Sequence, residues 1–87
     1  GTKLFIEVKG RIQSRAKVFS ITVSQVDFAN KNQEHHRLAL VAVSEDDPEL
    51  DEVRYIGHAF NHLDPAESTR AFTEDWNFYW EKGRNPY

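Results

Sequence analysis

Hydrophobic and polar residues alternate over residues 3–9, which is the period-two pattern of a β-strand. One side of this segment carries the aliphatic residues Leu4, Ile6 and Val8, and the other side carries Phe5, Glu7 and Lys9. Polar residues 10–15 predict a connection, and the β-branched and aromatic residues of 17–23 predict a second strand. We expect these two strands to form a hairpin.

A helix and a buried strand follow the predicted hairpin. Residues 25–33 contain good helix formers, and Ser24 is the expected N-cap because Asp27 stands three positions later, as in a variant capping box. The side chains expected to face inward are Val26, Ala29 and, as a further candidate, Phe28. Residues 37–44 are apolar at nearly every position, which favours a central strand covered on both faces.

The second half of the chain alternates between loops and apolar segments. Residues 45–52 hold six acidic side chains and predict a solvated loop, which lacks the Asp-x-Asp-x-Asp-Gly spacing of a calcium loop. Residues 53–60 predict a strand, residues 61–66 a turn, and residues 72–82 a terminal helix with Gly83 at its C-cap. This helix carries an aromatic stripe, which we expect in the core, with stacking on unpaired bases as the alternative. The stripe consists of Phe72, Trp76, Tyr79 and Trp80.

Length and composition predict one small domain. The chain has 87 residues, of which 39% are hydrophobic and none is cysteine, so disulfides, thiolate metal sites and a cysteine nucleophile are excluded. We expect a mixed α/β (α+β) fold, with a small mixed sheet of about four strands and two helices. The absence of methionine and the start at Gly1 predict that residues 1–87 are the C-terminal fragment of a larger protein. Such a cut would expose a sheet edge through which copies can self-associate.

The apolar segments predict a protein without a membrane partner. The longest apolar run, residues 38–43, is far shorter than the roughly 20 residues of a membrane-spanning helix. The first residues also lack the hydrophobic region of a signal peptide. We therefore expect a cytoplasmic, intracellular location.

Charge is distributed unevenly along the chain. Residues 1–37 hold seven Lys and Arg against three Asp and Glu, whereas residues 38–87 hold four against eleven. Clustered positive charge can attract a polyanion even when the net charge is negative, here -3, and the alternative is an ordinary scatter of solvated charge. The candidate nucleic-acid-binding cations are Arg11, Arg15 and Lys17.

The pair Glu7-x-Lys9 is the motif whose spacing suggests chemistry. Side chains two apart on a strand project side by side, so Glu7 could ligate a divalent metal while Lys9 positions a water or stabilises phosphate charge. Both roles belong to metal-dependent phosphodiester cleavage, which also needs at least one further carboxylate. The alternative is an ion pair that faces solvent.

The four histidines are weaker candidates. His35 and His36 are adjacent in a polar turn and are expected on the surface. His58 and His62, with Asp64 nearby, would suit zinc only on a helix, whereas the local sequence predicts a strand and a turn. A serine hydrolase is excluded because the chain has no Gly-x-Ser-x-Gly elbow.

The order of several segments resembles the NO VEIN C-terminal domain family. Those segments are Ile6-Glu7-Val8-Lys9-Gly10-Arg11, Ile21-Thr22-Val23-Ser24, residues 38–43, residues 53–56 and the terminal aromatic segment. The family has no established function, often stands beside helicase or restriction-type ATPase modules, and is similar to the PD-(D/E)XK nuclease superfamily. The Glu-Val-Lys-Gly block is the most specific of the shared features.

The resemblance implies a restriction-endonuclease-like core that lacks its N-terminal part, within a nucleic-acid-processing or defence protein. It implies that Glu7 is a catalytic metal ligand, that Lys9 is the catalytic lysine and that Gln25 points toward the site as a further nucleic-acid-binding residue. The intact parent would use Mg²⁺ or Mn²⁺, with a further Asp from a preceding strand. The fragment alone is then expected to hold no cofactor and to be inactive. The alternative is a non-catalytic domain that binds nucleic acid or a neighbouring domain, such as a helicase or ATPase domain of the same parent.

Overall fold

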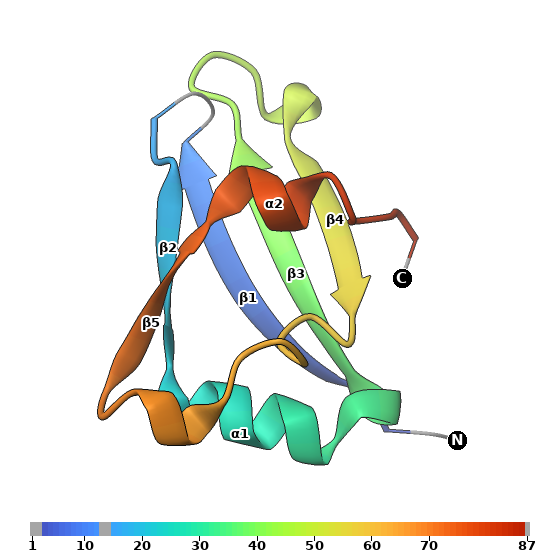
Figure 1. Ribbon diagram of the computed structural model, residues 1–87. Coiled ribbons are helices and arrows are strands. Elements are labelled where there is room, and N and C mark those ends of the chain that lie inside the picture. Colours follow the sequence, from blue (N-terminus) through green and yellow to red (C-terminus); the bar gives the residue numbers. More distant parts are fainter. Residues whose placement is uncertain (1–2, 13–14, 87) are drawn as a thin grey trace.

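The computed structural model describes residues 3–12 and 15–86, which form five strands and two α-helices (Figure 1). In chain order these elements are β1 Phe5–Ile12, β2 Val18–Thr22, α1 Val23–Lys31, β3 His36–Val43, β4 Glu52–Gly57, β5 Ala71–Asp75 and α2 Trp76–Trp80. The predicted mixed α+β fold is confirmed. The strands form a sheet of three and a sheet of two, in place of the single sheet of about four strands that we expected.

The three-stranded sheet has the order β1-β3-β4, with β3 in the centre as predicted. Strand β1 runs parallel to β3 and pairs with it over all eight residues, and β4 runs antiparallel to β3. The predicted hairpin is therefore wrong, because β2 pairs antiparallel with β5 in the second sheet. The connection after β1 also starts later than predicted, since Gly10, Arg11 and Ile12 pair with the end of β3. Residues 13–14 of that predicted connection lie outside the described residues.

Helix α1 begins two residues earlier than predicted, because Thr22 and not Ser24 is its N-cap. The Thr22 hydroxyl accepts a hydrogen bond from the Gln25 amide, and the Gln25 side chain accepts one from the Thr22 amide, both at 3.0 Å. This reciprocal pair is a capping box with Gln at its third helical position. The predicted inward residues Val26 and Ala29 are buried, whereas Phe28 is 45% exposed.

Residues 72–82 correct another prediction, since their first part is a strand. Phe72 lies in β5, opposite Ile21 of β2, and the helix begins only at Trp76. The Asp75 carboxylate accepts a hydrogen bond from the Asn77 amide at 2.9 Å and starts this short helix. The spacing of the aromatic residues matched a helix by coincidence, because Phe72 and Glu74 follow the period of two of a strand. The predicted core packing of Trp76 and Tyr79 is confirmed, as each is 1% exposed.

The core lies between the three-stranded sheet, the β2–β5 pair and the two helices, with α2 crossing in front of the sheet (Figure 1). We call the sheet face that carries Leu38 and Leu40 the inner face and the opposite face the outer face. The largest fully buried side chains are Trp76, Tyr79, Phe60, Ile21, Leu38, Leu40 and Val26. On the outer face, Ala39 is 3% exposed but Val43 is 38% exposed, so β3 is covered on both faces along only part of its length.

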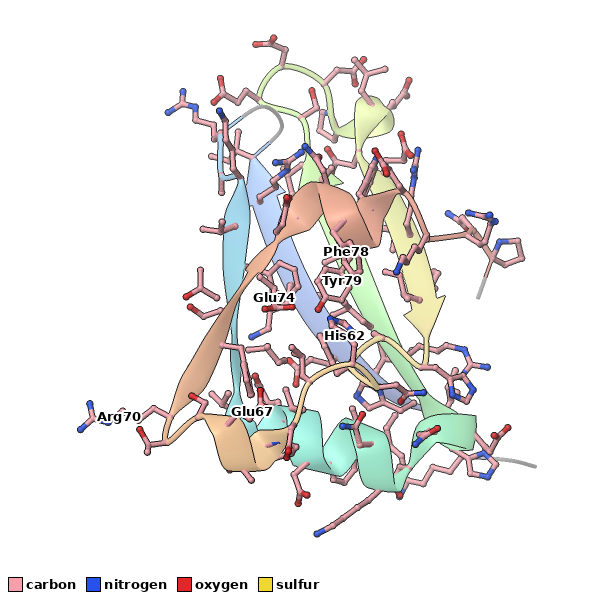
Figure 2. All side chains as sticks on the ribbon, in the orientation of Figure 1. His62, Glu67, Arg70, Glu74, Phe78 and Tyr79 are labelled. Atoms are coloured by element: carbon pink, nitrogen blue, oxygen red, sulfur yellow. The ribbon has the colours of Figure 1, made fainter. Side chains whose placement is uncertain are left out.

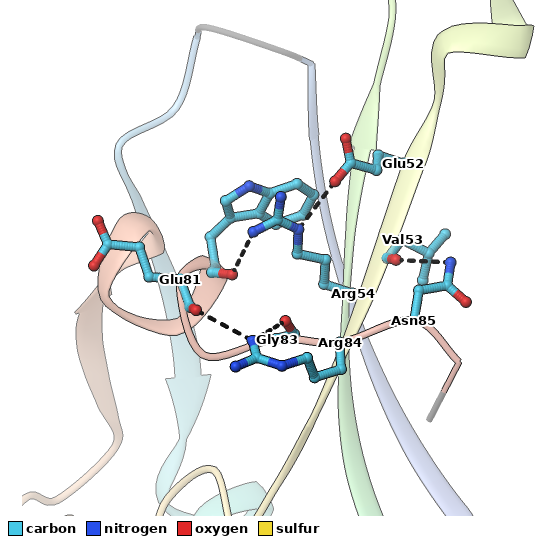
Figure 3. Close-up of polar contacts among 8 residues, drawn as sticks. Glu52, Val53, Arg54, Glu81, Gly83, Arg84 and Asn85 are labelled. Carbon is cyan, nitrogen blue, oxygen red and sulfur yellow. Dashed lines mark hydrogen bonds and ion pairs between the residues drawn. The ribbon is translucent and has the colours of Figure 1, made fainter.

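The C-terminal residues follow the edge of β4 (Figure 3). Arg84 forms a β-bridge with Tyr55, and the Asn85 side chain donates a hydrogen bond to the Val53 carbonyl at 3.1 Å. A Cβ at Gly83 would fall 2.6 Å from the Arg54 Cβ, so this position requires glycine. Gly83 therefore allows a close approach of two segments, and the helix C-cap is Glu81 instead.

No helix within the described part of the chain combines the length and the apolar composition that crossing a bilayer requires.

Candidate functional site

Glu7 and Lys9 lie on the inner face of β1, and both side chains are half-buried. Their positions in the register are opposite Leu38 and Leu40 of β3. Two residues along a strand span about 6.6 Å, so the two side chains leave the sheet side by side. The predicted strand and the predicted common face are confirmed. The predicted alternative of a solvent-facing ion pair is wrong, because the pair faces the interior of the molecule.

Gln25 holds Lys9 in place. The Lys9 ammonium donates a hydrogen bond to Gln25 Oε1 at 3.3 Å, and the same oxygen accepts the hydrogen bond of the Thr22 amide in the capping box. The start of α1 therefore fixes the acceptor, and the acceptor orients the ammonium. The structure thus brings together three of the residues singled out in the sequence, namely Glu7, Lys9 and Gln25.

Arg11 extends the inner row of polar side chains but packs within the fold. Its guanidinium lies over the Trp76 ring, with 4.5 Å between the guanidinium carbon and the ring centre. It also donates a hydrogen bond to the Ala16 carbonyl, while its Nε is buried and lacks a hydrogen-bond partner among the described residues. These contacts make Arg11 a partly buried structural residue.

The other two predicted cations are exposed, whereas Arg11 is partly buried. Arg15 forms an ion pair with Glu45 at 2.7 Å, so part of its charge is neutralised by the acidic loop. Lys17 is exposed, and its carbonyl accepts a hydrogen bond from the Trp76 amide at 2.9 Å. A contact with phosphate requires a cation at the surface that is not already paired with a carboxylate. Of the three predicted cations, Lys17 alone meets both conditions within the described part of the chain.

A pocket of about 290 Å³ lies beside Glu7 at the edge of β1. It is lined by Leu4, Phe5, Ile6, Glu7, Phe28 and His36. The Phe5 and Phe28 rings meet edge to face with 5.0 Å between their centres, and the rings of Phe28 and His36 lie 6.2 Å apart. Glu7 is the only residue of this lining that carries a full charge when His36 is neutral.

His36 corrects the prediction of a surface histidine, since it is 5% exposed. It is the first residue of β3 and pairs with Phe5 of β1. Burial and, secondarily, the charge of Arg37 lower the pKa of His36 below its ordinary value of 6.5. The imidazole is therefore neutral at pH 7.

The sequence did not single out Phe28 or His36 as site residues. Phe28 could have been found from the helical spacing, because Val26 and Ala29 form the buried stripe and a large aromatic residue beside it needs another neighbour. His36 could have been found as the first position of an otherwise apolar strand. Both signals are weak without the pairing of β1 with β3, which sets Phe5 opposite His36 so that Phe28 contacts both rings.

Histidines and carboxylates do not gather elsewhere as a metal site. Within residues 3–12 and 15–86, no group of three His, Asp or Glu side chains is arranged to bind a metal ion. His62 contacts Glu74 and Tyr79, and these side chains point toward one another in front of the sheet (Figure 2). The Tyr79 hydroxyl donates a hydrogen bond to Glu74 at 2.5 Å, and burial together with this bond raises the pKa of Tyr79. His58 instead contacts Gln33 at 3.1 Å.

As a metal ligand, Glu7 fits a divalent cation only in part. Its carboxylate is the hard oxygen donor that Mg²⁺ and Mn²⁺ prefer, and the half-buried position strengthens its attraction for a cation. Such a cation also needs oxygen ligands from elsewhere, such as water, substrate phosphate or another carboxylate.

Comparison with protein families gives one match for this arrangement. Residues 1–56 match the family described as Protein NO VEIN, C-terminal. The matched span includes β1, β2, α1, β3 and most of β4, and so contains Glu7, Lys9 and Gln25. Searches of the curated proteins and of the solved structures gave no significant match. Because the match covers more than half of the 87 residues, the chain belongs to the family of the NO VEIN C-terminal domain.

Proposed function

We propose that this domain is a nuclease-like module of a nucleic-acid-processing or defence protein. Glu7 and Lys9 would belong to a divalent-metal site that cleaves phosphodiester bonds. The observation that carries the proposal is the Lys9–Gln25 hydrogen bond on the same strand face as Glu7. It supports the proposal because a half-buried carboxylate and an oriented ammonium are placed together, as this chemistry requires.

The proposed roles follow from the chemistry of hydrolysis. A water oxygen forms the new bond to phosphorus, one ester P–O bond breaks, the water loses a proton and the leaving oxygen gains one. The bound cation would supply positive charge beside the phosphate. Glu7 would hold that cation, and Lys9 would stabilise the negative charge that grows on the phosphate oxygens. Gln25 would keep the Lys9 ammonium in position.

The remaining acidic ligand of this site would come from outside the described residues. Mg²⁺ and Mn²⁺ sites of this kind use one or two carboxylates together with water and phosphate oxygens. We propose Mg²⁺ or Mn²⁺ as the cofactor of the complete gene product, with a helicase or ATPase domain of the same polypeptide as the neighbour that delivers DNA or RNA.

The test is cleavage of labelled DNA and RNA by the complete product of the gene, with Mg²⁺ or Mn²⁺. We expect Glu7→Gln and Lys9→Met each to lower the single-turnover rate by about 100-fold or more, as expected for loss of one group that stabilises the transition state. Matched controls are Glu49→Gln in the acidic loop and Lys31→Met, whose ion pair with Asp27 is exposed. Unchanged cleavage in the Glu7 and Lys9 variants, or no cleavage by the natural protein, would contradict the proposal.

The second candidate function is a non-catalytic module that binds nucleic acid through Arg11, Arg15 and Lys17. The contacts of Arg11 with Trp76 and of Arg15 with Glu45 weigh against this alternative, because they engage two of its three cations. It predicts salt-dependent binding that Lys17→Ala and Arg15→Ala weaken, without cleavage under any metal condition.

A further inference from the structure

We infer that the pocket beside Glu7 binds an unstacked nucleobase, so that the substrate of the site is single-stranded nucleic acid. The inference rests on the proposed function, because it places the base next to the phosphate that Glu7 and Lys9 would engage. It goes beyond that function by naming the substrate class and the residues that would select it, Phe28 and His36.

The position of the pocket suits a nucleotide whose phosphate lies at the Glu7–Lys9 pair. Phe5, Glu7 and Lys9 follow one another on the inner face of β1 at steps of about 6.6 Å. The aromatic end of this row opens into the pocket, and its other end holds the ammonium that Gln25 orients. Because β1 is an edge strand of its sheet, a chain of nucleotides can reach this row from the side.

The lining favours a flat, uncharged ring over a phosphate. Four of the six lining residues are apolar, the imidazole of His36 is neutral, and the remaining charge is the carboxylate of Glu7. A carboxylate without a cation beside it repels phosphate, whereas a neutral imidazole can exchange a hydrogen bond with a base edge. The volume of about 290 Å³ is close to the lower limit of small-ligand pockets, roughly 300 Å³.

Phe28 is the side chain that would stack on the base. It is 45% exposed although it is large and apolar, and its edge-to-face contact with Phe5 holds the ring in one orientation. An aromatic ring that is held in place and open to solvent loses little entropy when a base stacks on it. Bases in a duplex are already stacked and paired, so the same pocket would discriminate against double-stranded substrates.

The experiment measures binding without cleavage, in EDTA. Fluorescence anisotropy of the complete gene product is recorded with a labelled ten-residue oligothymidylate, with its abasic equivalent and with a duplex. We expect Phe28→Ala to weaken binding of the oligothymidylate by about 5- to 20-fold, within the range found when one stacking residue is removed. Phe28→Trp should restore it, since tryptophan also stacks. Binding of the abasic strand and of the duplex should change less than twofold.

The matched control is Phe78→Ala, because Phe78 is 43% exposed and lies on α2, away from the pocket. Equal losses for Phe28→Ala and Phe78→Ala, or equal losses on base-containing and abasic strands, would overturn the inference.

The outcomes separate this inference from the proposed function. Glu7→Gln should lower the cleavage rate by about 100-fold or more, while the binding that remains should still depend on Phe28, because that part comes from stacking on the ring. Base-dependent binding that requires Phe28 in a protein that never cleaves would refute the nuclease and keep the pocket. Efficient cleavage of a duplex that is unaffected by Phe28→Ala would refute the pocket and keep the nuclease.

Discussion

The strands β1 and β3 are neighbours in one sheet, but they differ in which kind of side chain each turns toward the core. In β3 the inner face is buried along its whole length and is aliphatic after His36, with Leu38 and Leu40 at 0% exposure. In β1 the inner face carries Glu7, Lys9 and Arg11, while the outer face carries aliphatic residues that are about half exposed. Those outer residues are Ile6 at 44%, Val8 at 56% and Ile12 at 44% exposure.

This difference shows that β1 is not arranged to maximise apolar burial. Bringing Lys9 and Arg11 partly out of water costs free energy unless they find partners, and both have them in Gln25 and Trp76. Turning the strand over would bury Ile6 and Val8 instead, at about 25 cal/mol for each Å² of apolar surface removed from water. The chain keeps its polar row inside, which is the arrangement that a site on the inner face requires.

The largest expected effect sharpens the contrast between the two faces. Leu40→Ala on the inner face should lower the free energy of unfolding by about 2 to 5 kcal/mol, because it leaves a cavity in the core. Val8→Thr on the outer face should change it by no more than about 0.5 kcal/mol, because that side chain is more than half exposed. Urea unfolding midpoints compare the two variants. Similar losses would show that the outer face is as well buried as the inner one.

A smaller effect is expected at Gln25, which supports the polar row. Gln25→Ala removes both the acceptor of the Lys9 ammonium and half of the capping box, and should destabilise the domain by about 1 to 2 kcal/mol. Gln25→Glu keeps an acceptor for both donors and should retain most of the stability. Urea unfolding tests this pair. Equal losses in the Ala and Glu variants would mean that the hydrogen bonds of Gln25 do not support Lys9.

The smallest effect is the pH dependence of stability that comes from His36, which lies opposite Phe5 in the register of β1 and β3. Because burial lowers the pKa of folded His36 below 6.5, the unfolded chain takes up a proton first as the pH falls. The stability that neutral His36 provides is therefore complete above about pH 6.5 and decreases as the pH falls toward the lowered pKa. His36→Gln, measured beside the natural chain from pH 8 to pH 5, should remove this component. If the free energy of unfolding changed with pH in the same way in both proteins, the proposed contribution of His36 would be contradicted.

Local patterns in the sequence predicted faces and burial better than pairing. Alternation over residues 3–9 separated Glu7 and Lys9 from Ile6 and Val8, because side chains on a strand must alternate. Alternation could not tell which side faces the core, since this depends on how β1 packs after it pairs with β3. That pairing joins residues about thirty positions apart and leaves no local signal.

The candidate site was predictable only in its polar part. The Glu-x-Lys motif located Glu7 and Lys9, and the family resemblance located Gln25. Both signals come from short segments of the sequence. The pocket was not predictable, since His36 seemed to belong to a polar turn and became buried only when β3 began at that residue. Residues 72–75 misled for a similar reason, because aromatic spacing cannot distinguish a short helix from a strand that pairs with a distant partner.

The central claim is that Glu7 binds a divalent cation on the inner face of β1. The most direct measurement is the broadening of backbone amide NMR signals of the complete gene product during titration with Mn²⁺. Signals of the acidic loop at residues 45–52 provide an internal reference, because this loop and α1 lie at opposite ends of the molecule (Figure 1). We predict that Mn²⁺ broadens the amides near Glu7, Lys9 and Gln25, and that Glu7→Gln removes this broadening without changing that of the loop. Broadening that is confined to the loop would contradict the claim. Equal broadening of the amides near Gln25 in the natural protein and in the Glu7→Gln variant would also contradict it.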